Sequence, residues 1–244
     1  MVFFPSAQLV ARCVVVCAAV GAIMTIDLRD ALRLYLVTDQ QALRGRSLTD
    51  VVLQAVQGGV TCVQLREKTA STRDFVALAC ALNALLKPYR VPLVINDRID
   101  VALACGARGV HLGQSDMPAA QARQLLPPEV FIGLSVESPD DVRRAAVEPV
   151  DYLGVSPVFA TPTKTDTAPP WGLAGLRQVR TMTDLPLVAI GGIDLHNAAD
   201  VLDAGAHGLA VVSALCSADD PRAAAQSFRA LFAQPLPSDG CGCL

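Results

Sequence analysis

VTCVQLREK, residues 60–68, joins a short apolar stretch to a cluster of polar side chains. Its first half is β-branched or small and apolar, which favours a buried strand. The residues that follow are mostly polar: Gln64, Arg66, Glu67 and Lys68. Arg66 offers a planar fork of donors and Lys68 a mobile point charge, so this strand end is suited to a multiply charged anion. Taken alone, the stretch fits an ordinary solvated strand end equally well.

The same arrangement, an apolar strand followed by polar residues, recurs along the chain. Eight strands are predicted, at residues 32–39, 60–68, 92–97, 109–116, 131–138, 152–156, 185–193 and 208–213. Eight helices are predicted between and after them, at residues 49–57, 72–87, 101–104, 118–126, 140–147, 173–181, 196–204 and 221–232. The loop PVFATPTKTDTAPPWG (157–172) is unusually long, and its length suits a lid over a site.

This alternation predicts the fold class. Continuous apolar strands joined by helical crossovers indicate a parallel sheet that helices cover. Eight such units favour an α/β, single-domain (β/α)8 TIM barrel over residues 27–233, with an open doubly wound sheet as the competitor. In such barrels the loops that follow the strands open on one face, so the polar strand ends are expected to converge there.

Composition limits the partners of this barrel. Of 244 residues 52% are hydrophobic and 18% charged, with a formal net charge of -3. The chain therefore has no overall attraction for nucleic acid or acidic membranes, and any anion site must be local. Eight cysteines without a C-x-x-C pair indicate a reducing, cytoplasmic location and no structural zinc, and four of them are expected to fall in core strands or helices. The sequence leaves open whether the chain forms a homo-oligomer.

The two ends of the chain differ from the barrel. Residues 1–26 form an apolar extension whose longest apolar run, 13–24, is shorter than the roughly 20 residues of a spanning helix. A signal-like segment is the second interpretation, although its flank carries little positive charge. The interpretation that we favour is that Met24 is the native start, since it leads directly into the barrel. The tail, 234–244, is predicted to be disordered.

Two predicted neighbouring strands end in acidic or amide side chains. Asn96 and Asp97 end the third strand, and Asp116 follows the fourth. Two carboxylates at this depth can share a Mg²⁺ ion, which prefers oxygen ligands and substrate phosphates. Helix capping, for which Asp is common, is the equally weighted alternative.

The last two strands are predicted to form a phosphate pocket. Gly192 follows the seventh strand, and Val212 with Ser213 follows the eighth, which is the usual place for phosphate in such barrels. The long loop adds two hydroxyl groups and a cation with Thr161, Thr163 and Lys164, and Ser135 closes the fifth strand. The three histidines, at positions 111, 196 and 207, are expected to be structural. Two anion pockets, a Mg²⁺ site and few proton-transfer groups suit the ionisation of a diphosphate leaving group.

The chain resembles the thiamine-phosphate synthase family. The motifs that carry the resemblance are VQLREK (63–68), IND (95–97), HLGQSD (111–116), GLS (133–135), GVSPVFATPTK (154–164), AIGGI (189–193) and VVSA (211–214). It covers roughly residues 32–232. The resemblance implies two small phosphorylated substrates. A hydroxymethylpyrimidine diphosphate loses diphosphate, and the ring nitrogen of hydroxyethylthiazole phosphate, or of its carboxylated form, attacks the carbon left behind.

The resemblance also implies roles for single residues. The pyrimidine diphosphate would be held by Gln64, Arg66, Lys68, Asn96, Ser135 and Lys164. Asp97 and Asp116 would bind Mg²⁺. The thiazole phosphate would be held by Thr161, Thr163, Gly192, Val212 and Ser213. The catalytic residues would be Arg66, Ser135 and Lys164.

Two features depart from the family pattern, and two alternative functions stay open. The departures are the extension 1–26 and Glu137, where many relatives carry His. A thiazole tautomerase on the same barrel is the nearest alternative, and the intact diphosphate and metal residues count against it. A non-catalytic, membrane-tethered ligand-binding barrel is the other, suggested only by the apolar run 13–24. No nucleic-acid or membrane partner is expected.

Overall fold

Short apolar segments form parallel strands in the computed structural model, which describes residues 27–161 and 168–232. Their bounds are β1 Leu34–Val37, β2 Cys62–Leu65, β3 Leu93–Asn96, β4 Gly109–Leu112, β5 Phe131–Val136, β6 Tyr152–Val155, β7 Leu187–Ile190 and β8 Gly208–Val211. Each strand pairs with the next in parallel, and β8 returns to β1, where Tyr35 lies opposite Ala210. This pairing closes the barrel, which confirms the (β/α)8 fold and rules out the open doubly wound sheet.

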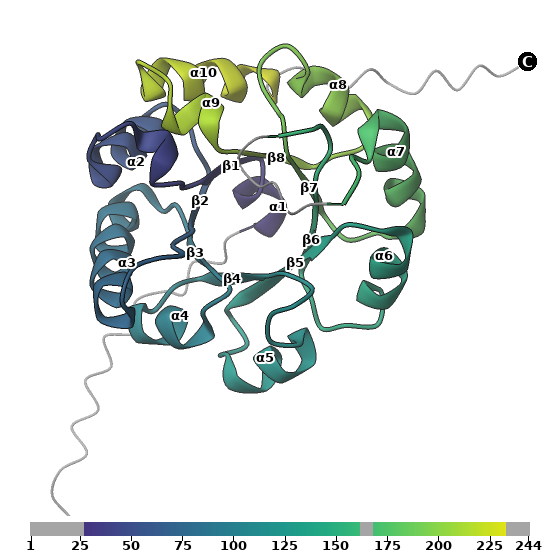
Figure 1. The fold of residues 1–244 in the computed structure, drawn as a ribbon, viewed down its shortest axis with the longest axis horizontal. Coiled ribbons are helices and arrows are strands. Elements are labelled where there is room, and N and C mark those ends of the chain that lie inside the picture. Colours follow the sequence, from purple (N-terminus) through teal and green to yellow (C-terminus); the bar gives the residue numbers. More distant parts are fainter. Residues whose placement is uncertain (1–26, 162–167, 233–244) are drawn as a thin grey trace, which may run out of the picture.

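Helices surround the barrel on its outer side, apart from α1 (Leu28–Ala31), which lies at the centre of the ring in Figure 1. Their bounds are α1 Leu28–Ala31, α2 Leu48–Gln57, α3 Thr72–Leu86, α4 Ile99–Cys105, α5 Ala119–Leu125, α6 Pro139–Ala145, α7 Gly172–Met182, α8 Ala198–Asp203, α9 Ser213–Cys216 and α10 Pro221–Leu231. The 3-10 helices η1 (Gln41–Leu43) and η2 (Lys87–Tyr89) lie in connections. All eight predicted crossover helices are present, whereas the short helices α1 and α9 were not predicted.

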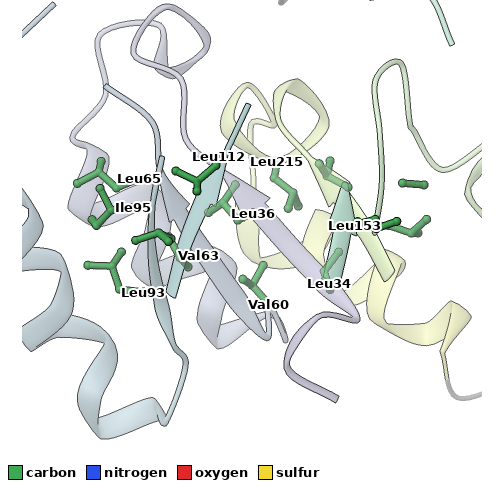
Figure 2. Close-up of a cluster of buried hydrophobic side chains, with 14 of the residues drawn as sticks. Leu34, Leu36, Val60, Val63, Leu65, Leu93, Ile95, Leu112, Leu153 and Leu215 are labelled. Atoms are coloured by element: carbon green, nitrogen blue, oxygen red, sulfur yellow. The ribbon is translucent and has the colours of Figure 1, made fainter. Parts of the chain in front are cut away.

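Side chains of each strand alternate between two apolar layers, as the two-residue period of a strand requires. Leu34 and Leu36 belong to the large outer layer between strands and helices, part of which Figure 2 shows. Tyr35 and Val37, which alternate with them, belong to the smaller layer inside the barrel. Since one layer fills the barrel interior and the other anchors the helices, both faces of the sheet are covered.

Helix α1 closes the amino-terminal end of the barrel. Leu28 and Leu32 pack against the inner apolar layer, and Figure 1 shows α1 over the centre of the strand ring. The Asp27 carboxylate starts this helix by accepting the backbone N–H of Arg29 at 2.9 Å. With this end covered by α1, the large cavity of the inner layer opens toward the carboxyl ends of the strands.

Some boundaries and burials differ from the sequence expectations. The predicted strand 60–68 ends at Leu65, because its polar residues leave the ladder toward the cavity described below. Of the four cysteines among the described residues, Cys62 and Cys216 are buried, whereas Cys80 is exposed and Cys105 half-buried, so the expectation of four core cysteines holds for two of them. Cys80 lies one residue past Ala79, which belongs to the buried stripe of α3.

Predictions for the chain ends fall outside the part that the structure describes. This applies to the extension 1–26, with the start at Met24, and to the tail 234–244. Among residues 27–161 and 168–232, no helix has the length and apolar character needed to cross a bilayer.

Candidate functional site

A cavity of about 960 Å³ opens at the carboxyl ends of the strands. Every described residue that was predicted to belong to the site lines it: Gln64, Arg66, Lys68, Asn96, Asp97, Asp116, Ser135, Thr161, Gly192, Val212 and Ser213. Thr163 and Lys164 lie outside the described residues. Residues from all eight strands or their following loops thus meet in one cavity, as the topology requires.

Arg66 is positioned by the end of the neighbouring strand β1. Its backbone N–H donates to Thr38 Oγ1 at 3.0 Å, and its guanidinium Nη1 lies 3.3 Å from Asp39 Oδ2. The other oxygen of Asp39 accepts the backbone N–H groups of Gln41 and Ala42 at 3.0 and 3.1 Å. Asp39 therefore cannot swing away freely, and it fixes the direction of the Arg66 side chain. Asp39 is not among the site residues predicted from the sequence.

Lys68 and Asp97 form an ion pair within the cavity, with Lys68 Nζ 2.5 Å from Asp97 Oδ2. Asp97 has a left-handed backbone with φ of 63°, a conformation that Asp adopts more readily than most residues. Its backbone N–H donates to the His111 carbonyl at 2.9 Å, which fixes the end of β3 against β4. The aspartate thus has a fixed backbone, while the lysine reaches it through a long side chain.

Asp116 approaches Asp97 from the loop after β4. Its Oδ2 accepts the Gly113 backbone N–H at 2.7 Å. Burial, and then contact with the Asp97 carboxyl, raise the pKa of Asp116 above its usual value. Among the described residues no group of three or more His, Cys, Asp or Glu side chains forms a metal cage. Two adjacent carboxylates therefore suit a hard cation that also takes phosphate and water ligands.

Five polar side chains form a hydrogen-bonded network across the barrel, here called the floor network: Gln64, Tyr35, Tyr152, His111 and Ser135. Gln64 Nε2 donates to the Tyr35 hydroxyl at 3.0 Å, and the two tyrosine hydroxyls lie 3.0 Å apart. His111 Nδ1 lies 2.9 Å from the Tyr152 hydroxyl, and its Nε2 lies 2.9 Å from Ser135 Oγ. The network links β2 to β5 beneath the cavity.

Burial keeps the two tyrosines of the floor network neutral, and the surrounding backbone leaves the network little room. Desolvation raises the pKa of both Tyr35 and Tyr152 well above the usual tyrosine value, so both hydroxyls stay protonated. A Cβ atom at Gly133 would lie 2.1 Å from Tyr152 Cζ, and one at Gly154 would lie 2.8 Å from His111 Cε1. The two glycines therefore make space for the rings.

The three histidines differ in position. His111 was expected to be structural, but it lines the cavity and contacts Ser135, so that interpretation was incomplete. His196 is exposed ahead of α8. His207 lies outside the cavity lining, between the guanidinium groups of Arg29 and Arg180. Burial and these two cations lower the pKa of His207 to about 4.

The side of the cavity at the ends of β7 and β8 carries different groups from the side at the ends of β2–β4. Gly192 has a φ of 63°, and a Cβ there would lie 2.7 Å from the Ala160 carbonyl oxygen. The loop after β6 therefore passes close to the end of β7, and Phe159 N–H donates to the Gly191 carbonyl at 3.0 Å. Ser213 begins α9 directly after β8, where barrels of this kind place phosphate.

Helix α9 is tied to the loop after β1. Arg46 donates to the carbonyls of Cys216 and Ala218, the latter at 2.7 Å. Ser217 Oγ donates to the Ala42 carbonyl at 3.0 Å. Arg44, which was not predicted from the sequence, adds an exposed cation to the same rim of the cavity and has a φ of 53°. This side therefore combines hydroxyl and backbone donors with a cation, but it lacks the carboxylate pair.

Comparison with known proteins gives consistent relatives. A family model described as thiamine monophosphate synthase matches residues 34–215. A thiamine-phosphate synthase of Albidiferax ferrireducens is 73% identical over 202 residues, which are 83% of this chain and 92% of that protein. One of Vibrio campbellii is 52% identical over 203 residues, 83% of this chain and 99% of that protein.

A solved structure agrees in both fold and sequence. The thiamine phosphate pyrophosphorylase of Pyrococcus furiosus superposes with a TM-score of 0.78 at 38% identity. The match covers 85% of this chain and 98% of that chain. The barrel and the positions of its strand ends are therefore shared with a protein of known structure.

Proposed function

The chain belongs to the thiamine monophosphate synthase family, and from this membership we propose how its cavity carries out the synthase reaction. The chain is a transferase that joins 4-amino-2-methyl-5-hydroxymethylpyrimidine diphosphate to hydroxyethylthiazole phosphate, or to its carboxylated form. The products are thiamine phosphate and diphosphate, and carbon dioxide is released as well when the carboxylated form is the substrate. The observation that carries the proposal is one cavity with unlike polar groups on its two sides: cations and a carboxylate pair at the strand ends of β2–β4, and hydroxyl and backbone donors at those of β7–β8.

We assign the pyrimidine diphosphate to the β2–β4 side. Arg66 and Lys68 supply positive charge at the end of β2, and Asn96 lies at the end of the neighbouring β3. Gln64 and Ser135, both members of the floor network, face the pyrimidine ring from below. Lys164 would add a third cation from the loop after β6, in a part of the chain that the structure does not describe.

We assign Mg²⁺ to Asp97 and Asp116. The proposal is supported by the close approach of the two carboxyl groups, whose mutual repulsion a divalent cation relieves. Mg²⁺ commonly binds one or two carboxylates together with substrate phosphates, so a third protein ligand is not required. When bound, the ion neutralises negative charge on the departing diphosphate.

We assign the thiazole phosphate to the β7–β8 side. Gly192 and Ser213 present backbone N–H groups and a hydroxyl, and Thr161 and Val212 complete the pocket. Thr163, which lies outside the described residues, would add a further hydroxyl. With its phosphate held there, the thiazole ring lies toward the pyrimidine, and the two reactants are kept in one orientation.

The chemistry then needs no enzyme nucleophile. The bond between the pyrimidine methylene carbon and the diphosphate oxygen breaks, and the electron pair leaves with the diphosphate. The aminopyrimidine delocalises the positive charge that develops on the carbon, and the lone pair of the thiazole nitrogen forms the new C–N bond. Arg66, Lys68 and Lys164 stabilise the charge that grows on the leaving group, and Ser135 orients the ring.

The direct test is to incubate the purified protein with both substrates and Mg²⁺ and to measure thiamine phosphate. With both substrates present, diphosphate should appear in the same amount as thiamine phosphate. Omitting either substrate should abolish thiamine phosphate formation. Incubating the carboxylated thiazole phosphate alone tests the tautomerase alternative, because isomerisation needs no pyrimidine. Isomerisation without thiamine phosphate formation would overturn the proposal. The cytoplasmic location stays a prediction.

A further inference from the structure

The two cations at the end of β2 have different carboxylate partners. Arg66 pairs with Asp39, whose second oxygen is occupied by two backbone N–H groups of η1. Lys68 pairs with Asp97, which also contacts the carboxyl group of Asp116. The carboxylate paired with Arg66 therefore also holds the backbone of η1. The carboxylate paired with Lys68 is one of the two proposed metal ligands.

The Lys68–Asp97 pair can part by movement of the lysine alone. The Asp97 backbone is held by its hydrogen bond to the His111 carbonyl, and its side chain is 22% exposed. The Lys68 side chain is 53% exposed and has a flexible stem of four carbon atoms. The aspartate thus stays in place while the ammonium group is free to reach another anion in the same cavity.

A divalent cation and the Lys68 ammonium compete for the same carboxylate. Without a metal, the lysine offsets the repulsion between Asp97 and Asp116. With a metal between these carboxylates, a nearby ammonium group is repelled, and the diphosphate becomes the favourable partner for it.

We propose that Lys68 exchanges counter-ions during the reaction cycle: it neutralises Asp97 until a divalent cation binds to Asp97 and Asp116, and it then moves to the diphosphate. This inference rests on the proposed function for the placement of the diphosphate. It makes metal and diphosphate binding mutually dependent through one side chain, since the metal releases the lysine that the diphosphate needs. After product release, the return of Lys68 to Asp97 helps to expel the metal.

The test measures metal binding without any substrate. Mn²⁺, whose paramagnetism reports its free concentration, is titrated into the wild type, Lys68→Met and Lys68→Gln. Removing the competing ammonium should strengthen Mn²⁺ binding about tenfold in both variants. Arg66→Met is the matched control: it removes one charge from the same strand end but leaves the Asp97 pair intact, so its gain should stay below about threefold.

A second measurement uses inorganic diphosphate with Mg²⁺. Lys68→Met should bind the magnesium–diphosphate complex at least about tenfold more weakly than the wild type, while it binds Mn²⁺ alone more tightly. These opposite changes are the signature of the exchange. If Lys68 bound phosphate without any link to the metal site, its substitution would weaken binding of magnesium–diphosphate and leave the Mn²⁺ affinity unchanged.

The proposal is overturned if both Lys68 variants bind Mn²⁺ no more tightly than the wild type. It is also overturned if Arg66→Met gains as much Mn²⁺ affinity as the Lys68 variants. Thermal denaturation of each variant shows whether it is folded, and the exposure of Lys68 makes both substitutions compatible with folding. Failure to form thiamine phosphate would refute the proposed function through a separate assay. An active synthase whose Lys68 variants do not gain metal affinity would refute the exchange alone.

Discussion

The hydroxyl groups of Tyr35 and Tyr152 lie 3.0 Å apart in the middle of the barrel, although 117 positions separate them along the chain. The first residue belongs to β1 and the second to β6, which lie on opposite sides of the closed sheet. Their contact joins the Gln64 end of the floor network to its His111 end. The floor of the cavity is thus held by side chains that cross the barrel.

The first prediction concerns Tyr152→Phe. The change removes the hydroxyl between Tyr35 and His111 and leaves buried polar groups without this partner, which should lower the free energy of unfolding by about 1–3 kcal/mol. Because Ser135 is held through His111, kcat/KM for the pyrimidine diphosphate should also fall about tenfold. Urea denaturation and steady-state kinetics measure the two effects. Unchanged kinetics in a destabilised variant would show that the network supports only the fold.

The second prediction concerns Gly133→Ala. The new methyl group would meet Tyr152 Cζ at 2.1 Å, a contact that the ring can relieve only by moving within the packed interior. The free energy of unfolding should fall by about 1–3 kcal/mol, and more if the ring cannot move. Gly45→Asn is the control, since a Cβ at Gly45 meets nothing within 4 Å and Asn tolerates its φ of 80°. Equal loss of stability in both variants would contradict the packing explanation.

The third prediction concerns the metal. Asp116→Asn should cut turnover and raise the Mg²⁺ concentration needed for half-maximal activity, since it removes one of two proposed ligands. Thermal unfolding should change little, because the amide oxygen can still accept the Gly113 N–H. Asp97→Asn should act in the same direction. Full activity of either variant at low Mg²⁺ would contradict the assignment of these carboxylates.

The fourth prediction separates the two anion sites. Arg66→Ala should lower kcat about a hundredfold, because its interaction strengthens as the leaving group gains charge. Ser213→Ala should chiefly raise KM for the thiazole phosphate, whose charge does not change during the reaction. Kinetics with each substrate varied in turn measure both effects. If Ser213→Ala lowers kcat as much as Arg66→Ala and leaves the thiazole KM unchanged, the two-site assignment is wrong.

The fifth prediction concerns pH and His207. Its folded pKa of about 4 lies below the unfolded value of 6.5, so the unfolded chain binds more protons between these values. The free energy of unfolding should therefore fall as pH is lowered from 6.5 toward 4, by about 1 kcal/mol after allowance for solvent screening of this half-exposed group. In His207→Asn this part of the pH dependence should disappear, whereas the exposed His196→Asn should retain it. If the free energy of unfolding depends on pH in the same way in His207→Asn and in the wild type, this prediction is wrong.

Local pattern was enough to predict the barrel and the residues at its strand ends. Apolar stretches at regular intervals, separated by helical periods, specify parallel strands with crossovers. Polar residues such as Arg66, Asp97 and Asp116 stand out because they interrupt apolar runs, and topology alone brings such strand ends to one face. The motifs around them also carried the family resemblance, which the relatives at up to 73% identity confirm.

Only the closed tertiary structure decided which residues position that site. Tyr35 and Tyr152 sit inside apolar strands and look like ordinary core residues in the sequence, because the alternating pattern does not say which face points into the barrel. Asp39 resembles a loop cap until β1 lies beside β2 and places it against Arg66. The Tyr35–Tyr152 contact crosses the interior of the closed barrel, whereas the Asp39–Arg66 pair needs β1 to lie beside β2. Residue chemistry is local in the sequence, whereas the choice of partner depends on how the strands are arranged in the folded barrel.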